Sequence, residues 1–326
     1  MKVAITGAAG HLGAALLQEL CKRNISVKAL IRGTDTRACE GLPVEIVKGD
    51  LLQPGILKSL LKDCDCVIHS AALISVNGDP SGLVHLTNVE GTRSVIQNAL
   101  EAGIKRCIHI SSIHAFQQKP SLETLDENRL PINEKGFAYE RSKLAGQQIA
   151  LSANQQGMEV IVVHPTSIVG PYDHKPSLVG KVLIDMYTGK LPFIFNGGFD
   201  FCDCRDVANA IANSLTMGRP GEAYLLGGKW HSLREFVGLL SKASGKNIRI
   251  MALPAVAATA GLPIIKLLAT IQKKEPLYTM EALDALFNGN RYICSTKAVA
   301  ELNYSIRPFE ETIAETYQWF RNKSYL

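Results

Sequence analysis

The amino-acid sequence predicts an α/β protein with a doubly wound parallel sheet, followed by a smaller and mostly helical domain. Short apolar segments alternate with helical patterns through the first half of the chain, as expected when each crossover helix covers a parallel sheet. The first apolar segment runs directly into a glycine-rich turn, TGAAGHLG, at residues 6–13. With 326 residues, 46% of them hydrophobic, the chain can bury a core in both parts.

Six strands and four helices are predicted in the first half. The strands are expected at 2–6, 26–32, 44–49, 66–71, 106–112 and 159–164. The helices are expected at 12–22, 55–62, 82–102 and 139–154. Right-handed crossovers then give the strand order 3-2-1-4-5-6. In such a sheet, ligands bind at the carboxyl ends of strands 1 and 4, where the chain reverses direction across the sheet.

The regular alternation ends near Gly170, where prolines and a Gly197-Gly198 pair indicate loops. Residues 1–170 are therefore expected to form the first domain and 171–326 the second. The segment 201–228 is expected to return to the first domain, with a further strand at 223–226. The apolar stretch 251–271 contains two prolines and a lysine, which suits a packed or membrane-surface helix better than a span, and we favour packing.

Composition argues against several classes of protein. A net charge of +5 from scattered Lys and Arg, with no run of five like charges, argues against a nucleic-acid partner. The N-terminus runs straight into a strand, so a cytoplasmic protein with reduced thiols is expected. The eight cysteines include the pairs Cys64/Cys66 and Cys202/Cys204, without further ligands at a metal-binding spacing. We interpret them as small apolar fillers and expect no metal.

Gly7, Gly10 and Gly13 predict a dinucleotide-binding turn between the first strand and the first helix. Glycines permit a tight turn and a close approach of the backbone to a pyrophosphate. The amino end of the helix, which includes His11 and Leu12, offers unpaired N–H groups and a positive dipole to the same group.

Arg32 ends the second strand, where NAD-binding proteins of this kind place a carboxylate for the ribose. Because a guanidinium can pair with a 2′-phosphate, Arg32 predicts NADP, while Asp35 leaves NAD as the alternative. Asp50 and Leu51 follow the third strand and are expected near the adenine. The other interpretation of Asp50 is a cap for the next helix.

Tyr139 and Lys143 lie four residues apart in a predicted helix and therefore share one face. An ammonium beside a phenol favours the ionised phenol, whose ordinary pKa is near 10, so this pair is suited to proton transfer. Ser112, at the end of the fifth strand, can donate to an oxygen that gains negative charge. Ser111 is expected to face the opposite side of the sheet.

Four histidines are the rival bases for the same chemistry. His69 and His109 lie in apolar strands and are expected to be hydrogen-bonded core residues, and His164 follows the sixth strand's apolar run. His114 comes just after the serine pair and is a candidate substrate contact.

Together these motifs, with His69-Ser-Ala-Ala and Asn88-Val-Glu-Gly-Thr, resemble the extended short-chain dehydrogenase/reductase superfamily over residues 1 to about 210. The resemblance implies that Tyr139 is the general acid or base, Lys143 its activator and ribose ligand, and Ser112 the donor to the substrate oxygen. It implies a structural role for Asn88. It also implies further contacts with the cofactor from Ala71, Ala72, Pro165, Ser167 and Ile168.

Within the superfamily, the string GLPVEIVKGDLLQPGILKSLLKDCDCVIHSAA with LIRG looks most like the dihydroflavonol-reductase-like group. Ile113-His114 after Ser112, in place of Asp-Glu, disfavours a dehydratase. We therefore expect an NADP-dependent carbonyl reductase or alcohol dehydrogenase whose second domain binds a medium-sized substrate. The alternatives are a nucleotide-sugar epimerase and a non-catalytic cofactor sensor. The resemblance also implies a homodimer formed through helices 82–102 and 139–154.

Overall fold

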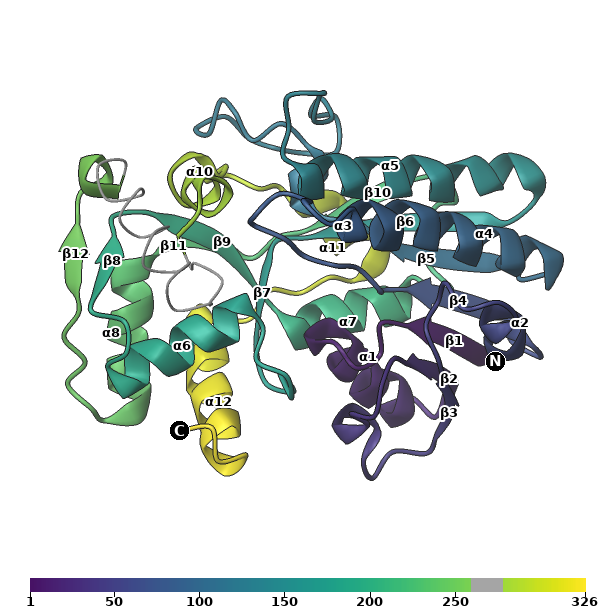
Figure 1. The fold of residues 1–326 in the computed structure, drawn as a ribbon, viewed down its shortest axis with the longest axis horizontal. Coiled ribbons are helices and arrows are strands. Elements are labelled where there is room, and N and C mark those ends of the chain that lie inside the picture. The colour runs from purple at the N-terminus through teal and green to yellow at the C-terminus, as the bar shows by residue number, and fades with distance from the viewer. Residues whose placement is uncertain (259–277) are drawn as a thin grey trace.

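The computed structural model describes residues 1–258 and 278–326, and its centre is a seven-stranded parallel sheet with helices on both faces (Figure 1). The strands are β1 (Lys2–Thr6), β2 (Ser26–Ile31), β3 (Val44–Lys48), β4 (Cys66–His69), β5 (Arg106–Ile110), β6 (Glu159–Pro165) and β10 (Ala223–Leu226). Their order, β10-β6-β5-β4-β1-β2-β3, confirms the predicted doubly wound fold.

Helices cover each face of this sheet (Figure 1). The helices of the first half are α1 (His11–Lys22), α2 (Ile56–Leu61), α3 (Leu83–His85), α4 (Gly91–Glu101) and α5 (Ala138–Ser152). A five-residue π-helical turn, Leu86–Glu90, joins α3 to α4, so these form the predicted helix 82–102. On one face, Val3 and Ile5 pack with the apolar side of α1; on the other, Ala4 packs with residues of α2 and α4.

The segment that follows residue 200 crosses between the two parts of the molecule. Helix α7 (Cys204–Asn213) packs beside α1 in the same core, and Arg23 of the α1 end donates to the Asn213 side chain at 2.8 Å. Strand β10 pairs with β6, so the predicted strand 223–226 lies at the edge of the large sheet.

The second part of the chain contains two small sheets as well as helices. One consists of β7 (Ser167–Val169), β9 (Gly198–Asp203) and β11 (Lys229–Ser232), and the other of β8 (Phe193–Phe195) and β12 (Met251–Leu253). The helices are α6 (Leu178–Thr188), α8 (Leu233–Ser244), α10 (Met280–Asn288), α11 (Thr296–Leu302) and α12 (Phe309–Asn322). A separate apolar core, with Leu183, Phe195 and Phe236 among its buried members, packs most of these elements together. Helix α11 instead packs through Ala298 and Leu302 in the core that α1 and α7 share.

The structure corrects some predicted boundaries. Strands β4 and β5 end two residues early because the chain leaves the sheet there, and Ala71, Ser111 and Ser112 therefore lie in loops at the carboxyl edge. The predicted apolar helix begins as strand β12, and residues 259–271 of it lie outside the described residues. Within the described ranges, no helix combines the length and the apolar character that crossing a membrane requires.

Candidate active site

The glycine-rich turn between β1 and α1 brings the backbone against the end of β4. Gly7 has φ +75°, and a Cβ at this position would lie 2.6 Å from the Ala71 nitrogen. The Gly10 N–H donates to the Gly7 carbonyl at 3.0 Å and closes the turn. Only glycine fits at residue 7, because a side chain there would be both strained and in contact with backbone atoms.

The amino end of α1 is the candidate phosphate site. Gly10 caps the helix without any side-chain hydrogen bond, so the N–H groups around His11 and Leu12 keep no side-chain partner. The residues present therefore fit a dinucleotide, with backbone donors and a helix dipole directed at its pyrophosphate. The His11 ring lies 3.0 Å from the Pro171 carbonyl, which links this end of the helix to the loop after β7.

The ends of β2 and β3 carry two ion pairs. The Arg32 guanidinium is exposed and lies 3.6 Å from the Asp50 carboxylate. Arg37 forms a forked pair with Asp35 at 2.6 and 2.8 Å, and these bonds lower the pKa of Asp35 to about 2. Asp50 does not cap α2, since Gly55 occupies that position, so the alternative interpretation of Asp50 is wrong. Leu51 beside it is buried.

Asn88 ties the loop after β4 to the helix that carries Tyr139. Its amide oxygen accepts the Leu73 N–H at 2.7 Å, and its amide nitrogen donates to the Leu73 carbonyl and to the Ser142 hydroxyl. These bonds hold the loop that contains Ala71 and Ala72 close to α5. Ala71 also donates its N–H to the Thr6 hydroxyl at 3.3 Å.

Ser112, Tyr139 and Lys143 converge at the carboxyl edge of β5. Tyr139 and Lys143 lie one turn apart on α5, and the Tyr139 phenol hydrogen-bonds with the Ser112 hydroxyl. The Ser112 oxygen also accepts the backbone N–H of His114 at 3.2 Å. The Lys143 ammonium is buried and donates to the Ile110 carbonyl at 2.6 Å. Ser111 instead places its hydroxyl 3.0 Å from Gln147 on α5.

The charge environment of the pair differs from the sequence-based expectation. Burial raises the pKa of Tyr139 to about 12, although the hydrogen bond with Ser112 acts in the opposite direction. Burial lowers the pKa of Lys143 to about 8. In the protein's own groups desolvation outweighs every other contribution to the pKa of Tyr139, and activation of the phenol by Lys143 with a bound cofactor stays a prediction.

Three buried histidines lie below α5 on adjacent strands. His69 contacts the hydroxyls of Thr6 and Thr92 at 2.7 and 2.9 Å, as a hydrogen-bonded core residue should. His109 has no hydrogen-bond partner among the described residues, so the same expectation is wrong for it. His164 lies 2.9 Å from the Ser112 carbonyl. Burial lowers the pKa of His69 to about 3 and of His164 to about 4, so these rings are neutral and unsuited to act as bases at pH 7.

The segment after β6 continues past the sheet edge. Pro165 is the last residue of β6. Ser167 and Ile168 form part of β7, which pairs with β9. This segment therefore leads from the nucleotide-binding sheet into the second part of the chain.

The sequence did not predict the pairing of His114 with Glu140. The His114 Nδ1 lies 3.3 Å from the Glu140 carboxylate, and its ring meets the edge of Tyr139 with 6.3 Å between centroids. Glu140 also accepts the Phe137 N–H at 2.9 Å at the start of α5. A signal was present, because a glutamate in the first turn of a helix is typical of amino-end capping.

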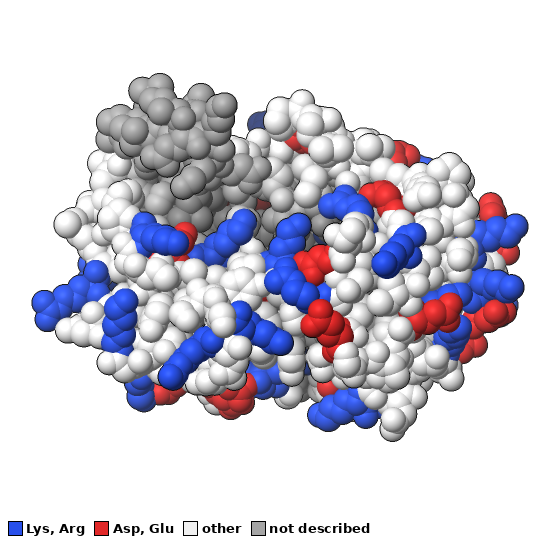
Figure 2. All heavy atoms as spheres, turned by 60° about the horizontal axis from the view of Figure 1, so that its bottom comes forward, with Lys and Arg blue, Asp and Glu red and all other residues white. Residues whose placement is uncertain are grey.

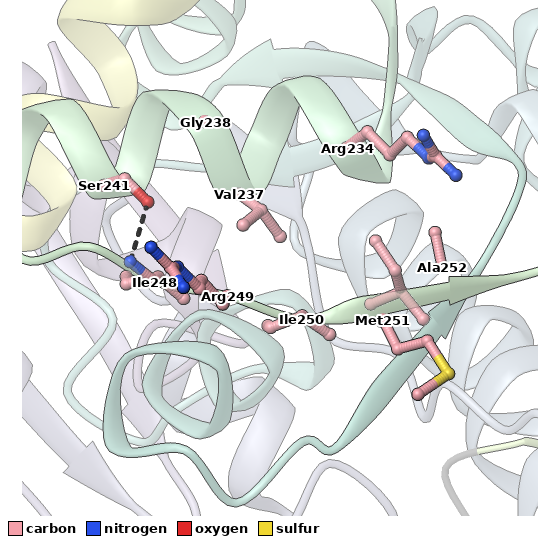
Figure 3. A pocket seen from close by; sticks show the side chains of 10 residues that line it. Arg234, Val237, Gly238, Ser241, Ile248, Arg249, Ile250, Met251 and Ala252 are labelled. Carbon is pink, nitrogen blue, oxygen red and sulfur yellow. Dashed lines mark hydrogen bonds between the residues drawn. The ribbon is translucent and has the colours of Figure 1, made fainter.

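A shallow groove of about 550 Å³ lies elsewhere, between α8 and the chain that leads into β12 (Figure 3). The side chains of Val237, Ile250 and Met251 line it, and Arg234 and Arg249 lie near its ends. None of the predicted site residues lines this groove.

The remaining features of the described residues are unremarkable for binding. The cysteines are free thiols, and no cluster of three or more His, Cys, Asp or Glu is arranged to hold a metal ion in the described ranges. Lys and Arg side chains are dispersed over the face in Figure 2 rather than gathered in a continuous stripe.

The family model for the NAD dependent epimerase/dehydratase family matches residues 3–227. The chain belongs to this family. It is an NAD(P)-dependent oxidoreductase of the extended short-chain dehydrogenase/reductase type, and the family resemblance seen in the sequence is confirmed.

The similar proteins cover most or all of the chain. It is 30% identical to sterol demethylase protein B of Methylococcus capsulatus, with 100% of both chains covered. It is 29% identical to a Synechocystis protein provisionally named dihydroflavonol 4-reductase, over 99% of this chain and 95% of the other. It is 30% identical to 4-hydroxy-2-methyl-3-oxo-4-farnesyl-3,4-dihydroquinoline-1-oxide ketoreductase of Stigmatella aurantiaca, over 80% and 78%. The crystal structure of gox2253 matches with a TM-score of 0.85 and 29% identity, over 100% and 99% of the two chains.

Proposed function

We propose that the protein is an NADP-dependent carbonyl reductase, or an alcohol dehydrogenase in the reverse direction, acting on a medium-sized and largely apolar ketone. The observation that carries this proposal is the convergence of the Ser112 hydroxyl and the Tyr139 phenol, with Lys143 one helical turn away. The name of the Stigmatella relative supports the substrate class, since it describes a ketone beside a hydroxyl on a molecule with a farnesyl chain.

When bound, a nicotinamide cofactor supplies the hydride. Tyr139 donates its phenolic proton to the substrate oxygen, and Ser112 donates a hydrogen bond to the same oxygen. The Ser112 oxygen accepts the N–H of His114, and its hydroxyl proton can be donated to the substrate oxygen. The Lys143 ammonium stabilises the phenolate that remains. The raised pKa of Tyr139 keeps the phenol protonated at pH 7, which suits a proton donor.

The cofactor contacts follow the edge of the sheet. Gly7, Gly10 and Gly13, with His11 and Leu12, are proposed to hold the pyrophosphate. Arg32 is proposed to hold the 2′-phosphate, which favours NADP, because its contact with Asp50 at 3.6 Å is long and exposed. The further proposed contacts with the cofactor are Asp50, Leu51, Ala71, Ala72, Tyr139, Lys143, Pro165, Ser167 and Ile168.

We also propose that the protein is a cytoplasmic homodimer. Leu83 and Leu86, at the start of the helix that continues into α4, are 50% and 41% exposed, which supports an interface on this side. Leu86→Arg should shift the molar mass measured by light scattering from dimer to monomer. A wild-type protein that is already monomeric contradicts this proposal.

The test of the reductase is direct transfer of deuterium. Purified protein is incubated with NADPH deuterated at C4 and a panel of apolar ketones, and the alcohol product is examined by mass spectrometry. The reductase proposal predicts one deuterium on the carbinol carbon. An epimerase predicts instead that the purified protein releases tightly bound oxidised cofactor on denaturation and turns over without net oxidation. If neither deuterium transfer nor bound oxidised cofactor is observed, the non-catalytic cofactor sensor is favoured.

A further inference from the structure

The loop that follows β7 runs between α1 and α12 (Figure 1). The His11 ring, beside the proposed pyrophosphate position, lies 3.0 Å from the Pro171 carbonyl. Three residues later, the His174 carbonyl accepts the hydroxyl proton of Tyr325, which follows α12. The loop 171–174 therefore connects the amino end of α1 with the segment after α12.

The Tyr325 hydroxyl also reaches the other end of the proposed cofactor site. It accepts a hydrogen bond from the Arg37 guanidinium at 2.8 Å. Arg37 is paired with Asp35, and both residues follow β2, where the ribose of the cofactor is expected. One hydroxyl thus joins the loop beside the proposed pyrophosphate position to the segment beside the proposed ribose position.

The end of α12 holds the Tyr325 ring in place. Ser324 has a positive φ of +60°, and its N–H donates to the Arg321 carbonyl at 3.1 Å. The Tyr325 N–H donates to the Phe320 carbonyl at 2.9 Å, which completes a Schellman motif. The Tyr325 ring packs edge-on against Phe320, with 5.6 Å between centroids, and lies nearly parallel to Trp319. Because this packing involves the ring alone, removal of the hydroxyl should leave the ring where it is.

The loop has a conformation that its contacts must maintain. Tyr172 has φ +69°, which is unfavourable for a residue other than glycine and persists only where the surroundings fix it. The buried Asp173 carboxylate accepts the backbone N–H and the hydroxyl of Ser177. The His174 ring meets the edge of Trp319 with 5.2 Å between centroids. The loop therefore depends on its contacts at both ends rather than on a low-energy conformation of its own.

We propose that Tyr325 is a positioning residue for the cofactor, whose hydroxyl holds the loop 171–174 and Arg37 beside the dinucleotide and slows its release. Release requires the loop to move, so each contact that holds the loop lowers the dissociation rate. The inference goes beyond the proposed reductase, since it concerns only the cofactor binding that the family shares. It involves the part that NADPH and NADH have in common, so Tyr325 acts on both cofactors, whereas Arg32 is proposed to distinguish them.

The test measures cofactor release in the absence of any ketone. Protein saturated with NADPH or NADH is mixed with excess oxidised cofactor, and the loss of nicotinamide fluorescence gives the dissociation rate constant. Tyr325→Phe removes one neutral and one charge-assisted hydrogen bond. It should raise this constant about 5- to 50-fold for both cofactors and keep the association rate constant within about threefold.

Tyr278→Phe is the matched control. It removes a hydroxyl that donates to the Phe193 carbonyl at 3.2 Å in the second part of the chain, and it should release both cofactors at wild-type rates. Wild-type release in Tyr325→Phe, or faster release of NADPH alone, overturns the proposal, as does a wild type that binds neither cofactor. A protein that reduces no ketone but responds to Tyr325→Phe in this way would refute only the reductase.

Hydrogen exchange separates positioning from a general loss of structure. With NADPH bound, the amides of residues 171–177 should exchange faster in Tyr325→Phe than in wild type, while those of α12 exchange as in wild type. Faster exchange throughout α12, or unchanged exchange in the loop, overturns the positioning role.

The contact at the other end of the loop provides a second variant. His11→Phe removes the contact with the Pro171 carbonyl and should also speed cofactor release. If both contacts hold one loop, the combination with Tyr325→Phe should speed release by less than the product of the two separate factors. Factors that multiply would overturn the role of the loop.

Discussion

The two ends of the proposed cofactor site differ in how their side chains are held. At the β5–α5 end, Ser112 and Lys143 are buried and bonded to backbone atoms. At the β2–β3 end, Arg32 and Asp50 form a long and exposed contact, with side chains 71% and 40% exposed. Packing leaves the first set few alternative positions, whereas exposed ion pairs contribute little and exchange partners easily. The side chains proposed to carry out the reaction are therefore held more firmly than those proposed to distinguish NADP from NAD.

The largest expected effect concerns the turn that both ends share. Gly7→Ala should weaken NADPH binding at least 100-fold, measured by fluorescence titration, because the new methyl group would meet the backbone at Ala71. Gly33→Ala is the matched control, since Gly33 also has a positive φ of +81° but has open space around it. It should change the dissociation constant less than about fivefold. Equal losses in the two variants would mean that backbone strain, not the close approach, explains the effect.

A smaller effect tests the buried end through its stability. Burial lowers the pKa of Lys143 to about 8 from the ordinary value of 10.5. Between pH 8 and 10 Lys143 therefore holds more protons in the unfolded chain, and its own contribution to the free energy of unfolding should rise with pH by about 2–3 kcal/mol. Buried thiols such as Cys107 and Cys202, whose pKa burial raises, contribute in the opposite direction, so the Lys143 contribution is measured as a difference between variants. Above pH 10 the raised pKa of Tyr139 acts in the opposite direction, which sets the upper limit of the window.

Urea unfolding at pH 8, 9 and 10 measures this dependence. The free energy of unfolding of wild type minus that of Lys143→Met should rise by this amount from pH 8 to pH 10, whereas the corresponding difference for Lys28→Met, which removes another buried lysine, should stay nearly constant. An identical pH dependence in wild type and Lys143→Met contradicts the assignment of the rise to Lys143.

The smallest effect tests the exposed end. Arg32→Asp should lower the ratio of kcat/KM for NADPH to that for NADH by about 10- to 100-fold, because a charged hydrogen bond to the 2′-phosphate is replaced by repulsion. Arg37→Gln serves as the control and should change this ratio less than about threefold, because the Arg37 guanidinium is already paired with the Asp35 carboxylate. If this ratio falls more in Arg37→Gln than in Arg32→Asp, the contact with the 2′-phosphate belongs to Arg37.

Sequence patterns predicted the large sheet and the candidate triad for physical reasons. Strand and helix alternation determines the order of a parallel sheet, and residues 139 and 143 share a helix face wherever that helix packs. The expectation that Ser111 faces the opposite side of the sheet is wrong, because both serines lie in the loop after β5 and the Ser111 hydroxyl contacts Gln147 on α5, the helix that carries Tyr139.

Other features depend on contacts between distant segments, which spacing does not reveal. The Arg37 guanidinium meets Tyr325, which lies 288 residues later, and His109 is buried without a partner where hydrogen bonds were expected. The small sheets β7–β9–β11 and β8–β12 also escaped prediction, because strands of three to six residues carry too little periodicity. The raised pKa of Tyr139 likewise arises from burial by the whole fold.

The most direct test of proton transfer by Tyr139 is the rate of NADPH oxidation in a single turnover with saturating ketone. Tyr139→Phe removes the phenolic proton and should slow this step by about 10² to 10⁴, with the dissociation constant for NADPH nearly unchanged. Tyr292→Phe, which alters an exposed tyrosine, should match wild type. A Tyr139→Phe rate within threefold of wild type would contradict the account.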